Sequence, residues 1–433
     1  MVNVVEEFRW RGLLSQHTDE DALRAAFEDS TMTFYCGFDP TAASLHVGHL
    51  VQLMTMRRLQ RAGHKPLALV GGATGMIGDP RMSGERVLNS PDVVEQWAAG
   101  LKEQISKFLD FDGAYGATMV NNLDWTASLS AIELLRDYGK HFRLGSMLAK
   151  DTVARRLDSD EGISFAEFSY QILQGMDYLE LYRRYGCTLQ TGGNDQWGNL
   201  LSGVDLIRRV ERASVHAMTT PLLTKADGTK FGKSESGDNW WLNSQYTSPY
   251  AFYQFWLNAD DRDIVTYVKA LSEKNRDEIE HVSYLTEAEP HRRAAQRSLA
   301  QELTMVVHGS QALSDVEEAS NALFGRGDIS SLSVSALEGV QKEVPSAELP
   351  RQELDKTTAV DLLVRTGLAT SRGVARRNIA DRGVSINGSP VDPTTVDRDA
   401  IDRGELTSGD LLHDRWIVVK RGRRNAAIVE LVS

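Results

Sequence analysis

The chain has 433 residues and a formal net charge of −12, from 48 Lys and Arg against 60 Asp and Glu. Hydrophobic residues make up 41% and charged residues 25%, a balance that is typical of a globular protein and excludes a disordered or low-complexity chain. No apolar run reaches the roughly 18 residues of a membrane-spanning helix, and the opening MVNVVEEFRWRG lacks the apolar core of a signal peptide. We therefore expect a cytoplasmic protein without membrane contact. The two cysteines, Cys36 and Cys187, are too few for a disulfide framework or a four-cysteine zinc site, so we expect reduced thiols and no protein-bound metal.

The first third of the chain alternates apolar runs with an amphipathic stretch. Thr33–Phe38 predicts a buried strand, His49–Arg61 a helix, and Pro66–Val70 a second strand that ends at two glycines. This order is the βαβ unit of a parallel sheet with helices on its faces. Ligands bind such sheets beyond the carboxyl ends of the strands, where Asp39–His49 and Gly71–Arg86 both lie.

Beyond this unit the chain predicts helices, a loop, a linker and a small tail. Residues 140–185 and 248–325 carry mostly helical patterns, and 192–199 (GGNDQWGN) predicts a polar loop. Residues 326–352 mix Gly, Ser, Pro and charge, which predicts a linker. The tail from residue 351 has a net charge of +2, whereas the rest of the chain carries −14, which leaves room for a local nucleic-acid site.

The motif His46-Val47-Gly48-His49 falls where the first strand gives way to the helix. Gly48 lets the backbone approach a ligand closely, and the start of a helix favours phosphate. The two imidazoles can donate hydrogen bonds to phosphate oxygens as charge develops in a transition state. The alternative is a pair of surface histidines at a helix start, but the strand–helix context favours a functional role.

A second motif, Lys230-Phe231-Gly232-Lys233-Ser234, lies in the segment LLTKADGTKFGKSESG. Two lysines three residues apart, among glycines, give a cationic loop that could fold over a polyphosphate. Taken alone, such a loop is more simply a solvated basic segment. The motif gains meaning when it is paired with the histidine motif.

HVGH and KFGKS together resemble the two signature sequences of class I aminoacyl-tRNA synthetases, often written HIGH and KMSKS. Six segments resemble bacterial tyrosyl-tRNA synthetases and occur in the order of that family: YCGFDPTAASLHVGHL, GGATGMIGDP, FSYQILQGMDY, GGNDQWGN, TKFGKSESG and SPYAFYQFW. Two departures stand out. The family has a lysine- and serine-rich stretch after GDP, where this chain has Arg81 and Arg86, and Phe231-Gly232 replaces Met-Ser.

The resemblance implies an α/β fold with a Rossmann-like parallel-sheet catalytic domain, a helical domain and a small α+β RNA-binding domain, in a homodimer. The expected boundaries are 1–220 for the catalytic domain, 221–247 for the region of the second signature, 248–325 for a helical anticodon-recognition domain, 326–352 for the linker and 353–433 for the RNA-binding domain.

The resemblance also implies the reaction of a tyrosine–tRNA ligase. L-tyrosine attacks ATP, accompanied by Mg²⁺, and gives tyrosyl-adenylate and pyrophosphate. The tyrosyl group then passes to the terminal adenosine of tRNA(Tyr). Neither step needs a covalent enzyme intermediate, so we expect catalysis by positioning and electrostatic stabilisation.

By the same resemblance, the tyrosine site consists of Tyr35, Asp79, Tyr170, Gln174, Asp177 and Gln196. Tyr35 and Asp177 would hydrogen-bond the phenolic hydroxyl, and phenylalanine would leave these buried groups unpaired. Asp79, Tyr170 and Gln174 would bind the α-ammonium group. Tyr170, Gln174 and Asp177 are spaced by four and three residues, so on a helix they share one face, although this spacing also fits a polar outer face.

The resemblance assigns the ATP and adenylate site to Cys36, Gly37, Asp39, Gly48, Gly193, Asp195, Lys233 and Ser234. His46 and His49 would stabilise the α-phosphate. Lys230 and Lys233 would neutralise the β- and γ-phosphates as pyrophosphate leaves. Cys36 is a ribose contact in this interpretation and not a redox centre.

The C-terminal segment resembles a small RNA-binding domain that also occurs in a ribosomal small-subunit protein. Thr358–Leu368 and 371–378 predict two helices, and 383–388 predicts a strand that ends in an Asn-Gly turn. The residues expected to bind RNA are Arg372, Arg376, Arg377, Lys420, Arg421, Arg423 and Arg424. A generic charged surface is the alternative.

Three rival functions fit parts of the sequence. Tryptophanyl-tRNA synthetase shares both signatures, but Tyr35 with Asp177 favours a phenol over an indole. A small nucleotidyltransferase would explain the H-x-G-H motif but not the lysine loop or the tail. An RNA-binding or splicing cofactor built on an inactive synthetase would be expected to lose some of the four His and Lys residues, and all four are present.

Overall fold

The computed structural model describes residues 3–80, 89–160, 162–229, 231–232, 239–324, 327–392, 411–422 and 425–433. The predicted site residues outside this part of the chain are Lys230, Lys233, Ser234, Arg423 and Arg424, together with Arg81 and Arg86 of the loop after GDP. The chain divides into two compact units, Met1–Asn243 with Ala259–Leu299 and Ser244–Asn258 with Ala300–Ser433. Within the described residues, no helix is long and apolar enough to cross a membrane.

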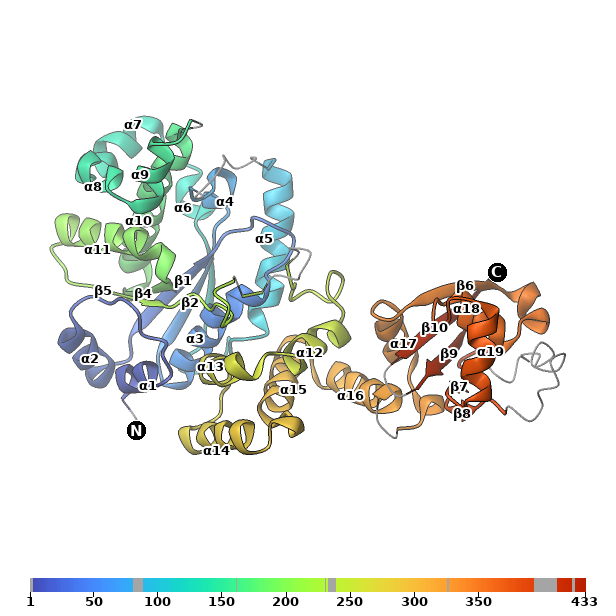
Figure 1. Ribbon diagram of the computed structural model, residues 1–433. Helices are drawn as coiled ribbons and strands as arrows, with labels where there is room; N and C mark the ends of the chain where they lie inside the picture. Colours follow the sequence, from blue (N-terminus) through green and yellow to red (C-terminus); the bar gives the residue numbers. More distant parts are fainter. Residues whose placement is uncertain are drawn as a thin grey trace. The chain divides into compact units, whose positions relative to one another are not determined.

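The first unit is built on a parallel sheet of five strands (Figure 1). The strands are β1 (Thr33–Phe38), β2 (Lys65–Val70), β3 (Thr118–Asn121), β4 (Cys187–Gly193) and β5 (His216–Thr220). Their order is β3-β2-β1-β4-β5, and every neighbouring pair is parallel. β1 and β2 are mostly buried because helices cover a parallel sheet on both faces. The strand order reverses between β1 and β4, which is where ligands bind sheets of this kind.

Helices surround this sheet and begin and end at recognisable caps. They are α1 (Val4–Trp10), α2 (Glu20–Asp29), α3 (Leu50–Arg61), α4 (Thr74–Ile77), α5 (Pro91–Ser106), α6 (Leu123–Thr126), α7 (Ala131–Glu133), α8 (Leu144–Leu148), α9 (Asp151–Leu157), α10 (Phe165–Tyr185), α11 (Trp197–Val210), α13 (Asp261–Leu271) and α14 (Arg276–Ala288). α10 begins after Ser164, whose hydroxyl accepts a hydrogen bond from the Glu167 amide, and it ends at Gly186 with a left-handed φ of 63°. Tyr35 and Tyr178 meet in the core between α10 and the sheet.

The second unit combines helices with a mixed sheet. Its elements are α12 (Pro249–Leu257), α15 (Ala294–His308, which begins in the first unit), α16 (Ser310–Phe324), α17 (Val334–Gln341), α18 (Ala359–Arg365), α19 (Arg372–Ala380), β6 (Ser346–Pro350), β7 (Val384–Ile386), β8 (Ser389–Pro390), β9 (Trp416–Arg421) and β10 (Asn425–Val432). The strand order is β6-β10-β9-β7-β8, and Leu363, Ile417 and Val429 are fully buried in the core. β7 and β8 join at Asn387-Gly388, which have φ angles of 48° and 87°, so the predicted Asn-Gly turn is confirmed.

The predicted fold class is confirmed, but two predicted irregular segments are ordered differently. Residues 326–352, predicted as a linker, contain α17 and β6, and Leu349 of β6 is fully buried. β6 pairs with the distant strand β10, and no local pattern reveals such a partner. Residues 192–199, predicted as a loop, form the end of β4, a 3₁₀ turn and the start of α11.

Candidate active site

Polar side chains gather at the edge of the sheet where the parallel strands end. Asp39 follows β1, the glycines Gly71 and Gly72 follow β2, and the 3₁₀ turn Asn194–Gln196 follows β4. The histidine motif lies directly before α3, which is the helix between β1 and β2. Parallel strands all end at the same edge, so segments far apart in the sequence meet here, as predicted.

Tyr35 and Asp177 close one end of the site. Tyr35 lies on β1, is 1% exposed, and packs its ring 5.3 Å from the ring of Tyr178. Among the described residues, no group hydrogen-bonds the buried Tyr35 hydroxyl. Asp177 on α10 accepts hydrogen bonds from Trp125 Nε1 at 2.9 Å and from Asn122 Nδ2 at 3.0 Å. A carboxylate has about four acceptor positions, so Asp177 retains capacity for a further donor such as a phenol.

Burial governs the protonation of this end of the site. It raises the pKa of Asp177 to about 7 because a buried charge loses its hydration, and the hydrogen bonds from Asn122 and Trp125 oppose the rise. Burial also raises the pKa of the Tyr35 hydroxyl, and the nearby Asp177 adds to this rise. Tyr35 is therefore neutral, whereas Asp177 titrates near neutral pH.

Asp39 links the two halves of the predicted tyrosine site. Its carboxylate accepts hydrogen bonds from Thr74 Oγ1 and from the Tyr170 hydroxyl, each at 2.7 Å. Asn122 Nδ2 donates both to Thr74 Oγ1 at 2.9 Å and to Asp177, so one hydrogen-bonded chain joins Asp39 to Asp177. Because Tyr170 donates its proton to Asp39, its oxygen remains an acceptor, which suits an ammonium ligand.

Asp79 lies just after α4 and is surrounded by donors from later parts of the chain. Its Oδ2 accepts a hydrogen bond from Gln196 Nε2 at 2.9 Å, so these two predicted residues do meet. Its Oδ1 accepts from Asn199 Nδ2 at 3.2 Å and from Lys150 Nζ at 3.4 Å. Gln174, on the same face of α10 as Asp177, has a buried Oε1 with no partner among the described residues. Together these groups make an acceptor-rich, acidic corner.

The histidine motif holds both imidazole rings by their Nδ1 atoms. His46 Nδ1 accepts a hydrogen bond from the Gly48 amide, and His49 Nδ1 accepts one from the His46 amide, each at 3.1 Å. The proton of each neutral ring is therefore on Nε2, which can donate to a phosphate oxygen. Burial, and then the neighbouring His46 ring, lower the pKa of His49 to about 3, so this ring is neutral at physiological pH. A Cβ at Gly48 would lie 2.8 Å from the His46 ring, which explains the glycine.

Main-chain hydrogen bonds through Trp240 connect the described residues of the second motif to the first motif. The Gly232 carbonyl accepts a hydrogen bond from the Trp240 amide at 3.2 Å, and the Trp240 carbonyl accepts one from the Val47 amide at 2.9 Å. Gly232 has a φ of 82°, and a Cβ there would lie 2.7 Å from Val47 Cγ2. Phe231 packs its ring 4.8 Å from that of Tyr267. The Phe231-Gly232 departure therefore provides a core anchor followed by a left-handed turn.

The other predicted adenylate residues line the same edge. Cys36 Sγ lies 3.9 Å from Gln52 Oε1, and burial raises the pKa of its thiol to about 12, which makes it unreactive. Gly37 is exposed in an otherwise mostly buried strand, so a ligand can approach its backbone. A Cβ at Gly193 would lie 2.6 Å from Asp195 Oδ1, so the glycine makes room for this exposed carboxylate. Among the described residues, no three His, Cys, Asp or Glu side chains form a metal-binding group.

Sequence reasoning missed five polar or aromatic residues that complete the site: Thr74, Asn122, Trp125, Lys150 and Asn199. Three of them carried a usable signal, and the first, Thr74, lies inside the segment GGATGMIGDP. Asn122 directly follows β3, at the edge where parallel strands present polar side chains to a ligand, and Asn199 lies inside GGNDQWGN. Lys150 and Trp125 carried none, because their partners Asp79 and Asp177 are more than 50 residues away in the sequence.

The predicted RNA-binding residues differ in exposure and in the hydrogen bonds and ion pairs that they already form within the second unit. Arg372 forms an ion pair with the acidic residue Asp361 of α18, and Arg376 is half-buried. Lys420 and Arg421 donate hydrogen bonds to main-chain carbonyls at 3.2 and 2.5 Å. Arg377 on α19 is exposed. Of the described members of this set, Arg377 is therefore the best placed to meet a phosphate.

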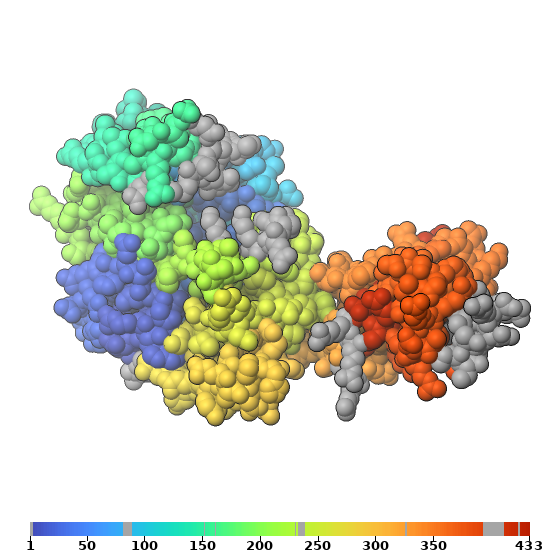
Figure 2. Space-filling view, viewed as in Figure 1, coloured from blue at the N-terminus to red at the C-terminus, as the bar shows by residue number. Residues whose placement is uncertain are grey.

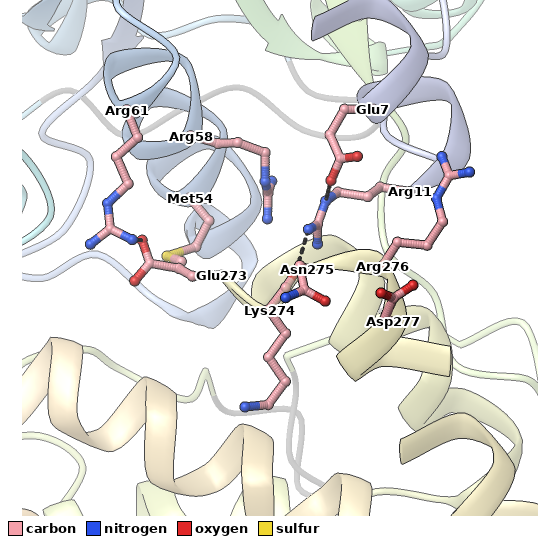
Figure 3. Close-up of a pocket in the computed structure, with 10 residues that line it drawn as sticks. All are labelled: Glu7, Arg11, Met54, Arg58, Arg61, Glu273, Lys274, Asn275, Arg276 and Asp277. Carbon is pink, nitrogen blue, oxygen red and sulfur yellow. Dashed lines mark hydrogen bonds and ion pairs between the residues drawn. The ribbon is translucent and has the colours of Figure 1, made fainter. Parts of the chain in front are cut away.

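A separate cavity of about 630 Å³ lies at the other end of α3 (Figure 3). It is lined by Glu7, Arg11, Met54, Arg58, Arg61, Glu273, Lys274, Asn275, Arg276 and Asp277. Two of its arginines, Arg11 and Arg58, cap the carbonyl end of α13. Arg11 Nη1 donates to the Lys269 carbonyl at 2.9 Å, and Arg58 Nη2 donates to the Ser272 carbonyl at 2.7 Å. The histidine motif precedes the first residue of α3, whereas Arg58 and Arg61 of this cavity lie in its last turn.

Comparison with known proteins agrees with this geometry. Residues 28–325 match the family model described as tRNA synthetases class I (W and Y), and residues 336–429 match that of the tyrosine–tRNA ligase SYY-like C-terminal domain. The tyrosine–tRNA ligase of Streptomyces griseus subsp. griseus is 58% identical over 432 residues, covering 100% of this chain and 99% of the relative. That of Mycobacterium tuberculosis is 51% identical over 431 residues, covering 99% of both chains.

A solved structure extends the likeness to three dimensions. The C-terminally truncated mitochondrial tyrosyl-tRNA synthetase of Aspergillus nidulans superposes with a TM-score of 0.68 at 30% identity, covering 75% of this chain and 95% of that chain. The chain therefore belongs to the class I tRNA synthetases of the W and Y family and, within it, to the tyrosine–tRNA ligases. The predicted family and enzyme class are both confirmed.

Proposed function

We propose that the chain activates L-tyrosine with ATP and then transfers the tyrosyl group to the terminal adenosine of tRNA(Tyr). The observation that carries the proposal is the buried pair of Tyr35 and Asp177 at the closed end of the site. A phenolic hydroxyl entering there donates to Asp177 and can accept from Tyr35. Phenylalanine would leave the buried Tyr35 hydroxyl unpaired and would offer Asp177 no third donor, and an unpaired buried polar group costs roughly 1–3 kcal/mol.

The site positions tyrosine by its two ends. The hydroxyl meets Asp177, and the α-ammonium meets Asp79, the buried Gln174 Oε1 and the Tyr170 oxygen. This leaves the carboxylate facing the open edge of the sheet, where ATP enters as its Mg²⁺ complex. A carboxylate oxygen then attacks the α-phosphorus, the bond to the β-phosphate's bridging oxygen breaks, and pyrophosphate leaves. Positioning of this kind replaces much of the entropic barrier to a two-substrate reaction.

The phosphates are stabilised by the two signature motifs. His46 and His49 donate from Nε2 to the oxygens on which negative charge grows. Because both rings are fixed through Nδ1, this stabilisation needs little reorganisation during the reaction. Lys230 and Lys233 are proposed to neutralise the departing pyrophosphate. Cys36, Gly37, Asp39, Gly193 and Asp195 are proposed to contact the ribose and adenine side of the adenylate.

Amino-acid-dependent exchange of pyrophosphate into ATP tests this function directly. The assay uses purified protein and Mg²⁺ without tRNA, and supplies tyrosine, phenylalanine and tryptophan separately. Exchange with tyrosine alone is the expected result. Exchange with tryptophan would keep the fold and overturn the assignment of Tyr35 and Asp177. Folded protein that exchanges with none of the three would instead favour an RNA-binding protein derived from a synthetase.

We propose that the second unit binds tRNA, and that α19 contributes through Arg377. An Arg377→Glu variant is expected to weaken tRNA binding about tenfold at low salt. The slope of the logarithm of the binding constant against the logarithm of the salt concentration should become shallower by about 1, the contribution of one phosphate contact, and pyrophosphate exchange should stay unchanged. Filter binding over a salt series measures this. Lys356→Glu makes the same charge change at another exposed position of the unit. Equal losses in both variants would assign the effect to overall charge rather than to α19.

We propose that the chain works as a homodimer that uses the apolar surface around α7–α10. Large hydrophobic side chains are exposed in this segment: Ile132, Leu135, Leu144, Leu148, Leu157 and Phe165. Figure 2 shows the segment as part of the molecular surface, coloured teal. Phe165 is 75% exposed at the start of α10. Large exposed apolar side chains that are concentrated in one segment favour an interaction site there.

A Phe165→Asp variant is therefore expected to dissociate the dimer, raising its dissociation constant about a hundredfold, because a charge would be buried without a partner. Sedimentation equilibrium at micromolar concentration measures the mass. Tyr284→Asp is the control, since Tyr284 on α14 is 65% exposed and lies outside the segment. An unchanged dimer for Phe165→Asp would exclude this surface. We further propose that the enzyme works in the cytoplasm, where ribosomes use charged tRNA.

A further inference from the structure

Lys150 pairs with Asp79, one of the three residues that the proposed function assigns to the substrate's α-ammonium. Its Nζ lies 3.4 Å from Asp79 Oδ1 and donates to Asn199 Oδ1 at 2.7 Å. The side chains of Lys150 and Asp79 are only 11% and 17% exposed, so the ion pair is largely shielded from water. Shielded charges interact more strongly than charges on an open surface.

The Asp79 carboxylate has little capacity for a second ammonium group while Lys150 stays in place. Its Oδ2 already accepts from Gln196 Nε2 at 2.9 Å, and its Oδ1 accepts from Asn199 Nδ2 as well as from Lys150. These three donors from the described part of the chain already use three of roughly four acceptor positions. Two ammonium groups on one carboxylate would also repel each other. We therefore expect an incoming ammonium to displace the lysine.

The surroundings of Lys150 allow this displacement. Its aliphatic stem lies over Gly198, where a Cβ would be 3.6 Å from Lys150 Cγ, so the stem is packed but not enclosed. Lys150 also lines a cavity of about 610 Å³, together with Asp195 and Trp197. The flexible side chain therefore has open space into which its ammonium head can turn away from Asp79.

We propose that Lys150 is an internal competitor for the ammonium site, and that tyrosine binding releases Lys150 from Asp79. The inference rests on the proposed tyrosine site. The lysine keeps Asp79 paired while the pocket is empty, which avoids an uncompensated, partly buried charge. It also makes the α-ammonium a requirement, because a phenol without an amine cannot replace the lysine on Asp79.

The test measures the affinity for two tyrosine fragments by equilibrium dialysis. Tyramine has the phenol and the amine, and 3-(4-hydroxyphenyl)propionate has the phenol but no amine. Lys150→Met keeps the stem over Gly198 and removes the charge, so it is expected to bind tyramine about tenfold more tightly than the wild type, with no such gain for the propionate. Arg155→Met, which removes an exposed charge from the same cavity, is expected to leave tyramine affinity within twofold of the wild type.

The outcomes separate this inference from the proposed function. Unchanged or weaker tyramine binding by folded Lys150→Met overturns the competition, and so does an equal gain for the propionate, because the lysine would then block the pocket without responding to the amine. Lys150→Gln also removes the charge, so it must show the same gain in tyramine affinity. It replaces Lys150→Met in the test if the Met variant fails to fold. Wild-type protein that binds neither tyrosine nor tyramine would overturn the tyrosine site itself and this inference with it.

Discussion

An Asp177→Asn variant is expected to lose about a hundredfold in kcat/KM for tyrosine, because two buried donors and, in the proposed function, the substrate hydroxyl all depend on one carboxylate. Trp125 Nε1 and Asn122 Nδ2 each donate to a different oxygen of Asp177. An amide keeps one acceptor oxygen and turns an NH₂ group toward the other donor. Pyrophosphate exchange over a range of tyrosine concentrations measures the loss. Asp124→Asn, at an exposed position beside Trp125, serves as the control and is expected to change little.

The same residue predicts a pH dependence in the wild-type enzyme. Burial raises the pKa of Asp177 to about 7, so the free enzyme loses this charged acceptor as the pH falls below neutral. We expect kcat/KM for tyrosine to decrease as the pH is lowered from 8 to 6. The Asp177→Asn variant should not show this acidic limb of the pH profile. A limb that persists unchanged in the variant would assign the titration to another group.

Stability should respond to pH in the opposite direction. The pKa of Asp177 rises from 3.8 to about 7 on folding, so between these values the folded state holds a proton that the unfolded state has lost. The free energy of unfolding therefore decreases as pH rises through this window, by roughly 2–4 kcal/mol from this one group. Urea unfolding of the wild type and of Asp177→Asn at pH 5 and pH 8 isolates the contribution of Asp177 to the free energy of unfolding, because the variant cannot titrate at this position.

The parts of the fold that follow from local pattern were predictable from the sequence. The apolar runs gave β1 and β2, and the spacing of Tyr170, Gln174 and Asp177 correctly placed all three on one helix, α10. The histidine motif was expected at a strand-to-helix junction and lies there. Each of these features depends on residues that are close together in the chain, so the sequence carries the information directly.

The remaining features depend on which distant segments pack together. Lys150 meets Asp79, and Trp125 meets Asp177, only after the segment between β3 and α10 has folded over the end of the sheet. The interior segment Ser346–Pro350 has the composition of a linker, yet it becomes a strand because β10 supplies its hydrogen bonds. The orientation of the two histidines was also beyond prediction, since it depends on which backbone amides their Nδ1 atoms reach.

Replacing the histidines tests that orientation. His46→Ala and His49→Ala are each expected to lower kcat for pyrophosphate exchange about a hundredfold, because each removes a proposed donor to the negative charge that develops on the phosphate. The KM for tyrosine should stay within about twofold, since neither ring contributes to the proposed tyrosine contacts. His281→Ala, at an exposed position on α14, is the control.

The pH dependence of kcat separates electrostatic stabilisation by the histidines from acid–base chemistry, and a double variant tests whether the two rings act together. Burial lowers the pKa of His49 to about 3, so a neutral Nε2–H donates at every pH between 5 and 9, and no ionisation of His49 should appear in kcat over that range. His49 Nδ1 also holds the backbone amide of His46, so the two rings are coupled. We therefore expect the double variant to lose less than the product of the two single losses. A loss that appears in KM for tyrosine, or a pH limb in kcat that His49→Ala abolishes, would contradict the role of a fixed neutral donor.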